Sequence, residues 1–120
     1  MDLYKNIGKL FYAISASDKV IKTIEFKALK KSLDTQWRND YTKAQINAII
    51  DSFLFLKDCY ASPNICFNEF SKYKEEHEWL FTTKLKNLIF NTSCSIASSF
   101  ASKNKSELIL LAKLGLLFKK

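Results

Sequence analysis

Residues that make tight turns are scarce in this sequence, which has two glycines and one proline in 120 positions. Sheet-rich folds need many turns, and turns usually need glycine or proline. The scarcity therefore argues against an all-β architecture and favours long helices with few connections. Apolar runs are short too, since none reaches the roughly 18 residues that a membrane-spanning helix requires.

Signals for secretion and for disulfide pairing are also missing. Residues 1–5 lack the basic-then-apolar order of a signal peptide. The cysteines Cys59, Cys66 and Cys94 are odd in number and show no CxxC spacing, which argues against a disulfide framework or a zinc ribbon. We therefore expect free cysteines that pack as small apolar residues, in a protein of the reducing cytoplasm.

Motifs that carry catalysis are absent as well. The sequence has no glycine-rich phosphate loop, no GxSxG elbow and no HExxH pair. Its one histidine, His77, lies among Glu75, Glu76 and Glu78 at the end of a predicted helix, and we expect it on the solvated surface. The sequence therefore predicts no catalytic residues, no cofactor and no enzymatic activity.

The charge is one-sided, with 19 Lys and Arg against 12 Asp and Glu and a net charge of +7. The excess is spread evenly over the two halves of the chain, and Arg38 is the only arginine. Nucleic-acid readers favour arginine forks and clustered basic stripes. Scattered lysines indicate solvated helix faces instead, so a basic nucleic-acid-binding helical protein is the less favoured alternative.

What remains is the composition of a folded helical domain. The chain is 48% hydrophobic and 14% aromatic, which suffices for a core without disulfides or metal. Apolar residues recur with helical spacing, so we expect one domain over residues 1–120, an all-α compact bundle of about six or seven helices. The predicted helices run from Asp2 to Ser17, from a cap at Thr23 to Trp37, from a capping box at Thr42 and Gln45 to Leu56, from Phe67 to Glu76, from a cap at Thr82 or Thr83 to Phe100, and from Ser106 onward. Residues 58–65, with Pro63, form the clearest predicted loop.

The last two predicted helices have unusual compositions. Residues 93–101 are nearly all Ser, Ala and Cys, which lets neighbours approach closely and predicts that this helix is central. The final helix is apolar almost all round, from Leu108 to Phe118. We expect its burial against the first and fifth helices, with a homodimer or a heteromeric interface as the alternative.

One acidic pair is a candidate metal site. Asp18 ends the first predicted helix and Glu25 opens the second, so a tight turn brings both carboxylates to the same end. Calcium and magnesium prefer oxygen ligands, and calcium takes six or more of them. Two carboxylates make a weak site, and the simpler interpretation is that Asp18 pairs with a lysine or caps the turn while Glu25 complements the helix dipole.

The same residues carry a family resemblance. The chain resembles the tellurite-resistance TerB-like family of small all-helical bacterial domains, in which an alanine-rich helix is followed by an Asp-Gly turn, an Ile or Val, and a Glu that opens the next helix. Ala13, Ala16, Asp18, Ile21 and Glu25 match that pattern in kind and spacing. The resemblance implies a helical bundle with a weak internal helix-turn-helix repeat.

The departures from the family pattern concern the metal. Residues 100–111 are similar to the family's second copy, but Lys103, Asn104 and Lys105 stand where that copy would supply further acids. Lys19 replaces the glycine after Asp18. The resemblance therefore supports the fold more than cation binding.

These observations together favour a small non-catalytic cytosolic helical protein, a stress-response or protein-interaction module with a protein partner. A divalent-cation sensor using Asp18 and Glu25, with calcium or magnesium as its ligand, is the first alternative. Nucleic-acid binding is the second.

Overall fold

The computed structural model describes residues 2–17, 23–99 and 105–119 and confirms an all-α bundle. Its α-helices are α1 (Asp2–Ser15), α2 (Thr23–Ser32), α3 (Lys43–Asp58), α4 (Pro63–Glu76), α5 (Thr83–Ser98) and α6 (Lys105–Lys119). A π-helical turn, η1 (Leu33–Trp37), extends α2, and a 3₁₀ turn, η2 (Glu78–Leu80), follows α4. The described ranges contain no strand, and no helix in them is both long and apolar enough to cross a bilayer.

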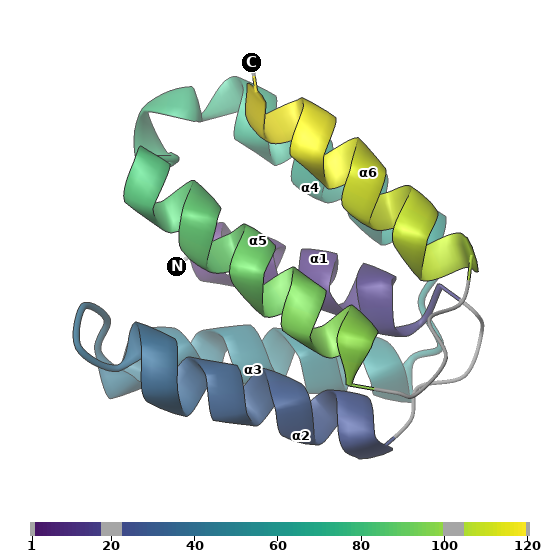
Figure 1. Ribbon diagram of the computed structural model, residues 1–120, viewed down its shortest axis with the longest axis horizontal. Coiled ribbons are helices and arrows are strands. Elements are labelled where there is room, and N and C mark those ends of the chain that lie inside the picture. Colours follow the sequence, from purple (N-terminus) through teal and green to yellow (C-terminus); the bar gives the residue numbers. More distant parts are fainter. Residues whose placement is uncertain (1, 18–22, 100–104, 120) are drawn as a thin grey trace.

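Helix α1 is the centre of the bundle. It lies between α4 and α6 on one side and α2 and α3 on the other, with α5 across it (Figure 1), and it packs against all five. Residues 6–15 are buried almost without interruption except at Lys9. The serine-rich fifth helix, expected to be central, packs against α1, α2, η1 and α6, while α1 contacts every other α-helix. The close approach of α1 to α3 occurs at Gly8. A Cβ atom there would lie 2.7 Å from both the Ile49 carbonyl oxygen and the Ser52 Cβ.

Side-chain caps set the starts of three helices. Thr42 accepts a hydrogen bond from the Gln45 amide, and the Gln45 side chain accepts one from the Thr42 amide, which confirms the predicted capping box before α3. Thr82, rather than Thr83, caps α5 through the Leu85 amide. Helix α4 starts at Pro63, with Ser62 as its cap, and not at Phe67. Proline suits the first turn of a helix, where its missing N–H is not needed.

The connection between α3 and α4 is consequently shorter than the predicted loop over residues 58–65. Helix α3 ends in a Schellman motif, in which the Ala61 amide donates to the Leu56 carbonyl and the Tyr60 amide to the Lys57 carbonyl. Tyr60 takes the left-handed conformation with φ of 53°, a position that usually holds glycine. The Tyr12 hydroxyl donates to the Ala61 carbonyl at 2.7 Å and ties this turn to the central helix.

The predicted second helix changes type before its end. Helix α2 stops at Ser32 and continues as the π-helical turn η1, which sequence periodicity did not predict. Leu33 and Trp37 are both fully buried there, and the Trp37 indole donates to the Thr92 hydroxyl of α5 at 2.9 Å. The turn is thus held to the neighbouring helix by a buried hydrogen bond.

Helix α6 is buried on one side only. Leu110, Leu114 and Leu117 face the core, and the helix packs on α5 and α1, which confirms the predicted neighbours. In Figure 1 it runs along the outer edge of the bundle beside α5. Leu108, Ile109, Ala112 and Leu116 of this helix are exposed.

Candidate functional site

The predicted acidic pair lies only partly within the described structure. Asp18 falls among residues 18–22, outside the described ranges. Glu25 is the third residue of α2 and is 1% exposed, so its carboxylate faces the interior rather than solvent. Glu107 is the third residue of α6 and is 2% exposed. Each of the two glutamates is therefore a buried acid in the first turn of its helix.

Metal ligands do not cluster in the part of the chain that the structure describes. Residues 2–17, 23–99 and 105–119 hold no group of three or more His, Cys, Asp or Glu side chains that could bind an ion together. Lys19, Lys103 and Asn104 lie outside these ranges, whereas Lys105 is exposed at the start of α6. The described structure therefore contributes Glu25 alone from the predicted pair.

The histidine is more sheltered than expected. His77 is half-buried and stacks on Tyr73, with ring centroids 4.1 Å apart, instead of standing free in solvent. Its Nδ1 lies 2.9 Å from the Tyr73 carbonyl oxygen, and the Trp79 ring is tilted against it with centroids 5.1 Å apart. The ring is thus fixed by aromatic packing at the end of α4.

The cysteines differ in setting. Cys66 is buried, and burial raises the pKa of its thiol, with Glu69 adding to the rise and Lys9 opposing it. A raised pKa keeps the thiol protonated near neutral pH, which suits packing rather than nucleophilic attack. Cys59 is exposed at the end of α3.

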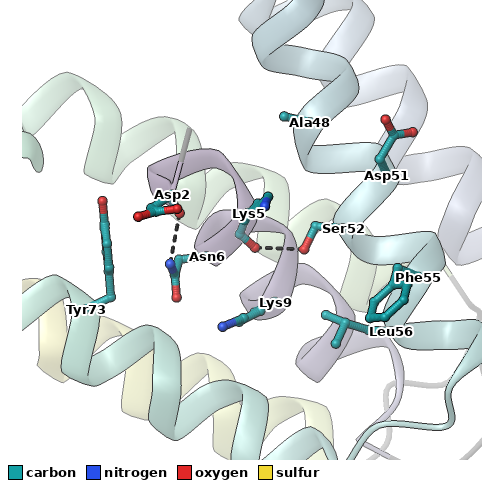
Figure 2. Close-up of a pocket in the computed structure, with 10 residues that line it drawn as sticks. All are labelled: Asp2, Lys5, Asn6, Lys9, Ala48, Asp51, Ser52, Phe55, Leu56 and Tyr73. Atoms are coloured by element: carbon teal, nitrogen blue, oxygen red, sulfur yellow. Dashed lines mark hydrogen bonds between the residues drawn. The ribbon is translucent and has the colours of Figure 1, made fainter.

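A groove of about 710 Å³ runs between α1, α3 and α4. Figure 2 shows Tyr73 of α4 on one wall, Phe55 and Leu56 of α3 on the other, and α1 side chains between them. The remaining lining residues are Asp2, Lys5, Asn6, Lys9, Ala48, Asp51 and Ser52. This volume lies within the range of small-molecule sites.

The polar groups of this groove are balanced against one another. Lys9 pairs with Glu69 at 3.3 Å, and the Asn6 amide donates to the Asp2 carbonyl at 2.8 Å. The Ser52 hydroxyl donates to the Lys5 carbonyl (dashed in Figure 2), which joins α3 to α1. With two lysines and two aspartates in the lining, the groove shows no preference for either sign of charge.

The clearest unpartnered feature is an apolar row on α6. Leu108, Ala112 and Leu116 recur every fourth residue and are exposed, and Ile109 lies beside them. We call these four residues the α6 outer face. Leu116 is 64% exposed, an unusual setting for a leucine in a row of this kind.

The exposed charges of α6 itself all have one sign. Lys105, Lys113 and Lys119 are exposed along α6, while its one acidic residue, Glu107, is buried. From residue 79 to the end, the sequence holds seven lysines and a single acid. The excess of basic residues over acids is similar in the two halves of the chain, so this local excess is visible only when the charges are compared helix by helix.

Comparisons with known proteins add no relative. No family model, no curated protein and no solved structure matches the chain.

Proposed function

We propose that the protein is a small non-catalytic interaction module of the cytoplasm, TerB-like in its helical plan and serving a stress response, and that it binds a protein partner through the α6 outer face. The observation that carries this proposal is the exposed row formed by Leu108, Ala112 and Leu116. A helix with apolar positions at i, i+4 and i+8 on its outer side can pack against a second helix as it does against its own core.

The charge pattern selects the chemistry of the partner. Exposed lysines at positions 105, 113 and 119 flank the apolar row, and no exposed acid of α6 offsets them. A second copy of the chain docked face to face would bring lysines against lysines, which is unfavourable. An amphipathic helix with apolar residues flanked by Asp and Glu complements both features, and such a helix is the occupant we propose.

The interaction is tested by Leu116→Lys, with Ile65→Lys as its matched control. Ile65 is 59% exposed on α4, so both variants place a lysine on an exposed apolar residue without disturbing the core. Quantitative capture from native cells should recover a partner with wild type and with Ile65→Lys but lose it with Leu116→Lys, because a lysine would have to be desolvated in the interface.

Two outcomes would contradict the proposal. Recovery of the same proteins by wild type and Leu116→Lys would show that the α6 outer face is not the binding surface. Sedimentation of the purified chain as a dimer that Leu116→Lys dissociates would assign the surface to a second copy instead.

A divalent-cation sensor using Asp18 and Glu25 is a second candidate, favoured by the burial of Glu25. Charge–charge attraction is stronger away from water, so a sheltered carboxylate is a better ligand than a solvated one. In this case calcium or magnesium should raise the melting temperature of the wild type, Asp18→Asn should abolish the rise, and Asp58→Asn, an exposed control, should keep it. A wild type whose melting is unaffected by either ion would exclude the sensor.

A further inference from the structure

A second cleft lies on a face of the molecule that the proposed interaction does not use. It measures about 540 Å³ and opens between α2, η1 and the start of α3. Its lining residues are Lys30, Asp34, Arg38, Tyr41, Lys43, Ile46, Asn47 and Ile50. Unlike the groove of Figure 2, this cleft is unequal in charge, with three cationic side chains and one acidic one.

The three cations of the cleft have no carboxylate partner in the described part of the chain, although the Lys30 ammonium lies over the Phe26 ring, 5.9 Å from its centroid. Within the described ranges, none of Lys30, Arg38 and Lys43 forms an ion pair, although Lys9, Lys74 and Lys84 elsewhere each have one. The neighbouring carboxylate of Asp40 pairs with Lys84 at 2.9 Å, which further weakens the negative field near the cleft. Unpaired cations that share one concave surface attract an anion.

Arg38 is the side chain of this cleft that is best suited to bind a phosphate group. Arg38 is the only arginine of the chain and directly follows the π-helical turn η1. A guanidinium group offers a planar fork of donors that matches two oxygens of a phosphate, which a lysine cannot do. Turns of the π type are rare in proteins, and those that do occur frequently lie at functional sites. Here the turn is fixed by the buried Trp37–Thr92 hydrogen bond, so the adjacent Arg38 is carried on a rigid element.

The floor of the cleft is apolar. Ile46 is buried, and Ile50 and Tyr41 are half-buried beside it. The Tyr41 ring packs on Trp37, with centroids 5.1 Å apart, and on Tyr4 at 6.2 Å, so its position is set by two neighbouring rings. A ligand that fills this cleft therefore needs an anionic group for the cations and a flat apolar group for Tyr41 and the isoleucines.

We propose that this cleft binds a phosphate monoester carried on an aromatic group. The phosphate lies against Arg38 with Lys30 and Lys43 on either side, and the ring lies on Tyr41 and Ile46. A phosphate monoester carries nearly two negative charges at neutral pH, which three cations and one aspartate can accommodate. A phosphotyrosine side chain of a partner presents this group directly, and a free nucleoside monophosphate presents a phosphate monoester and an aromatic base joined by a ribose.

Titration with phenyl phosphate, followed by amide chemical shifts, tests the site. Saturable shifts should concentrate on residues 38–50, and Arg38→Gln should weaken binding about tenfold or more, as loss of a bidentate charged contact predicts. Arg38→Lys should restore only part of the affinity. Lys57→Gln, which removes an equal charge from an exposed position outside the cleft, should bind like wild type. Inorganic phosphate should bind more weakly than phenyl phosphate, because it lacks the ring.

Two further probes separate the sources of the ligand. Adenosine monophosphate binding more tightly than a phosphotyrosyl peptide assigns the site to a free nucleotide, and the reverse order assigns it to a modified partner; both orders support the proposal. Equal, unsaturable shifts at lysines throughout the chain, or unchanged affinity in Arg38→Gln, would overturn it. Leu116→Lys should bind phenyl phosphate with the affinity of the wild type. This result would show that ligand binding in the cleft does not depend on the α6 outer face.

Discussion

Replacing Trp37 with alanine should lower the free energy of unfolding by about 4 kcal/mol, the cost typical of removing a fully buried large aromatic side chain. Trp37 has no exposed surface and packs edge-on against Phe11 of the central helix, with centroids 6.3 Å apart. It also joins η1 to α5 through the hydrogen bond to Thr92. Urea unfolding followed by circular dichroism measures the loss.

The hydrogen-bonded part of this effect can be isolated with a second pair of variants. Thr92→Val leaves the buried indole N–H without its acceptor and should cost about 1–3 kcal/mol, whereas Thr92→Ser keeps the hydroxyl and should cost less. In a Trp37→Phe background, Thr92→Val should be nearly neutral because no donor remains to be stranded. An equal cost in both backgrounds would show that the bond does not hold η1 to α5.

Replacing Gly8 with alanine should destabilise the protein by about 2 kcal/mol, as overpacking of a tight contact does. The added Cβ would meet the Ile49 carbonyl oxygen and the Ser52 Cβ at 2.7 Å, and a carbonyl of α3 cannot rotate away. Helices α1 and α3 would have to separate. The same unfolding titration in urea reports this change.

Gly115 provides the matched control for Gly8, because it is also a helical glycine. A Cβ there would lie 3.8 Å from the Phe90 ring, an ordinary contact distance. Gly115→Ala should therefore stabilise α6 by about 0.5–1 kcal/mol through helix propensity. Destabilisation of similar size in both variants would refute the view that α1 and α3 meet at Gly8.

Features that depend on nearby residues were predictable from the sequence. The capping box of Thr42 and Gln45 needs a spacing of three, and the cap at Thr82 needs only its own first helical turn. The start of α4 was misplaced because Pro63 was interpreted as a loop residue when it occupies the first turn of a helix. The π-helical turn had no sequence signal, since Leu33 and Trp37 also fit an α-helical stripe.

Features that depend on distant residues were not predictable. The close approach of α1 to α3 rests on a contact between Gly8 and residues more than forty positions away in α3. The basic cleft combines Lys30 and Arg38 with Lys43, which are separated in sequence and meet only when α2 and α3 pack. The apolar composition of the last helix predicted burial, with partner binding as the alternative. In the structure one side of α6 packs in the core and the other side is exposed.

The central claim is that the α6 outer face binds a partner helix with acidic flanks. Isothermal titration calorimetry of the captured partner against wild type, Leu116→Lys, Ile65→Lys and the triple reversal of Lys105, Lys113 and Lys119 to Glu tests it most directly. We predict that Leu116→Lys and the triple reversal each weaken binding by about tenfold or more, equivalent to about 1.4 kcal/mol, while Ile65→Lys leaves the affinity unchanged. Unchanged affinity in Leu116→Lys, or tighter binding after the charge reversal, would contradict the account.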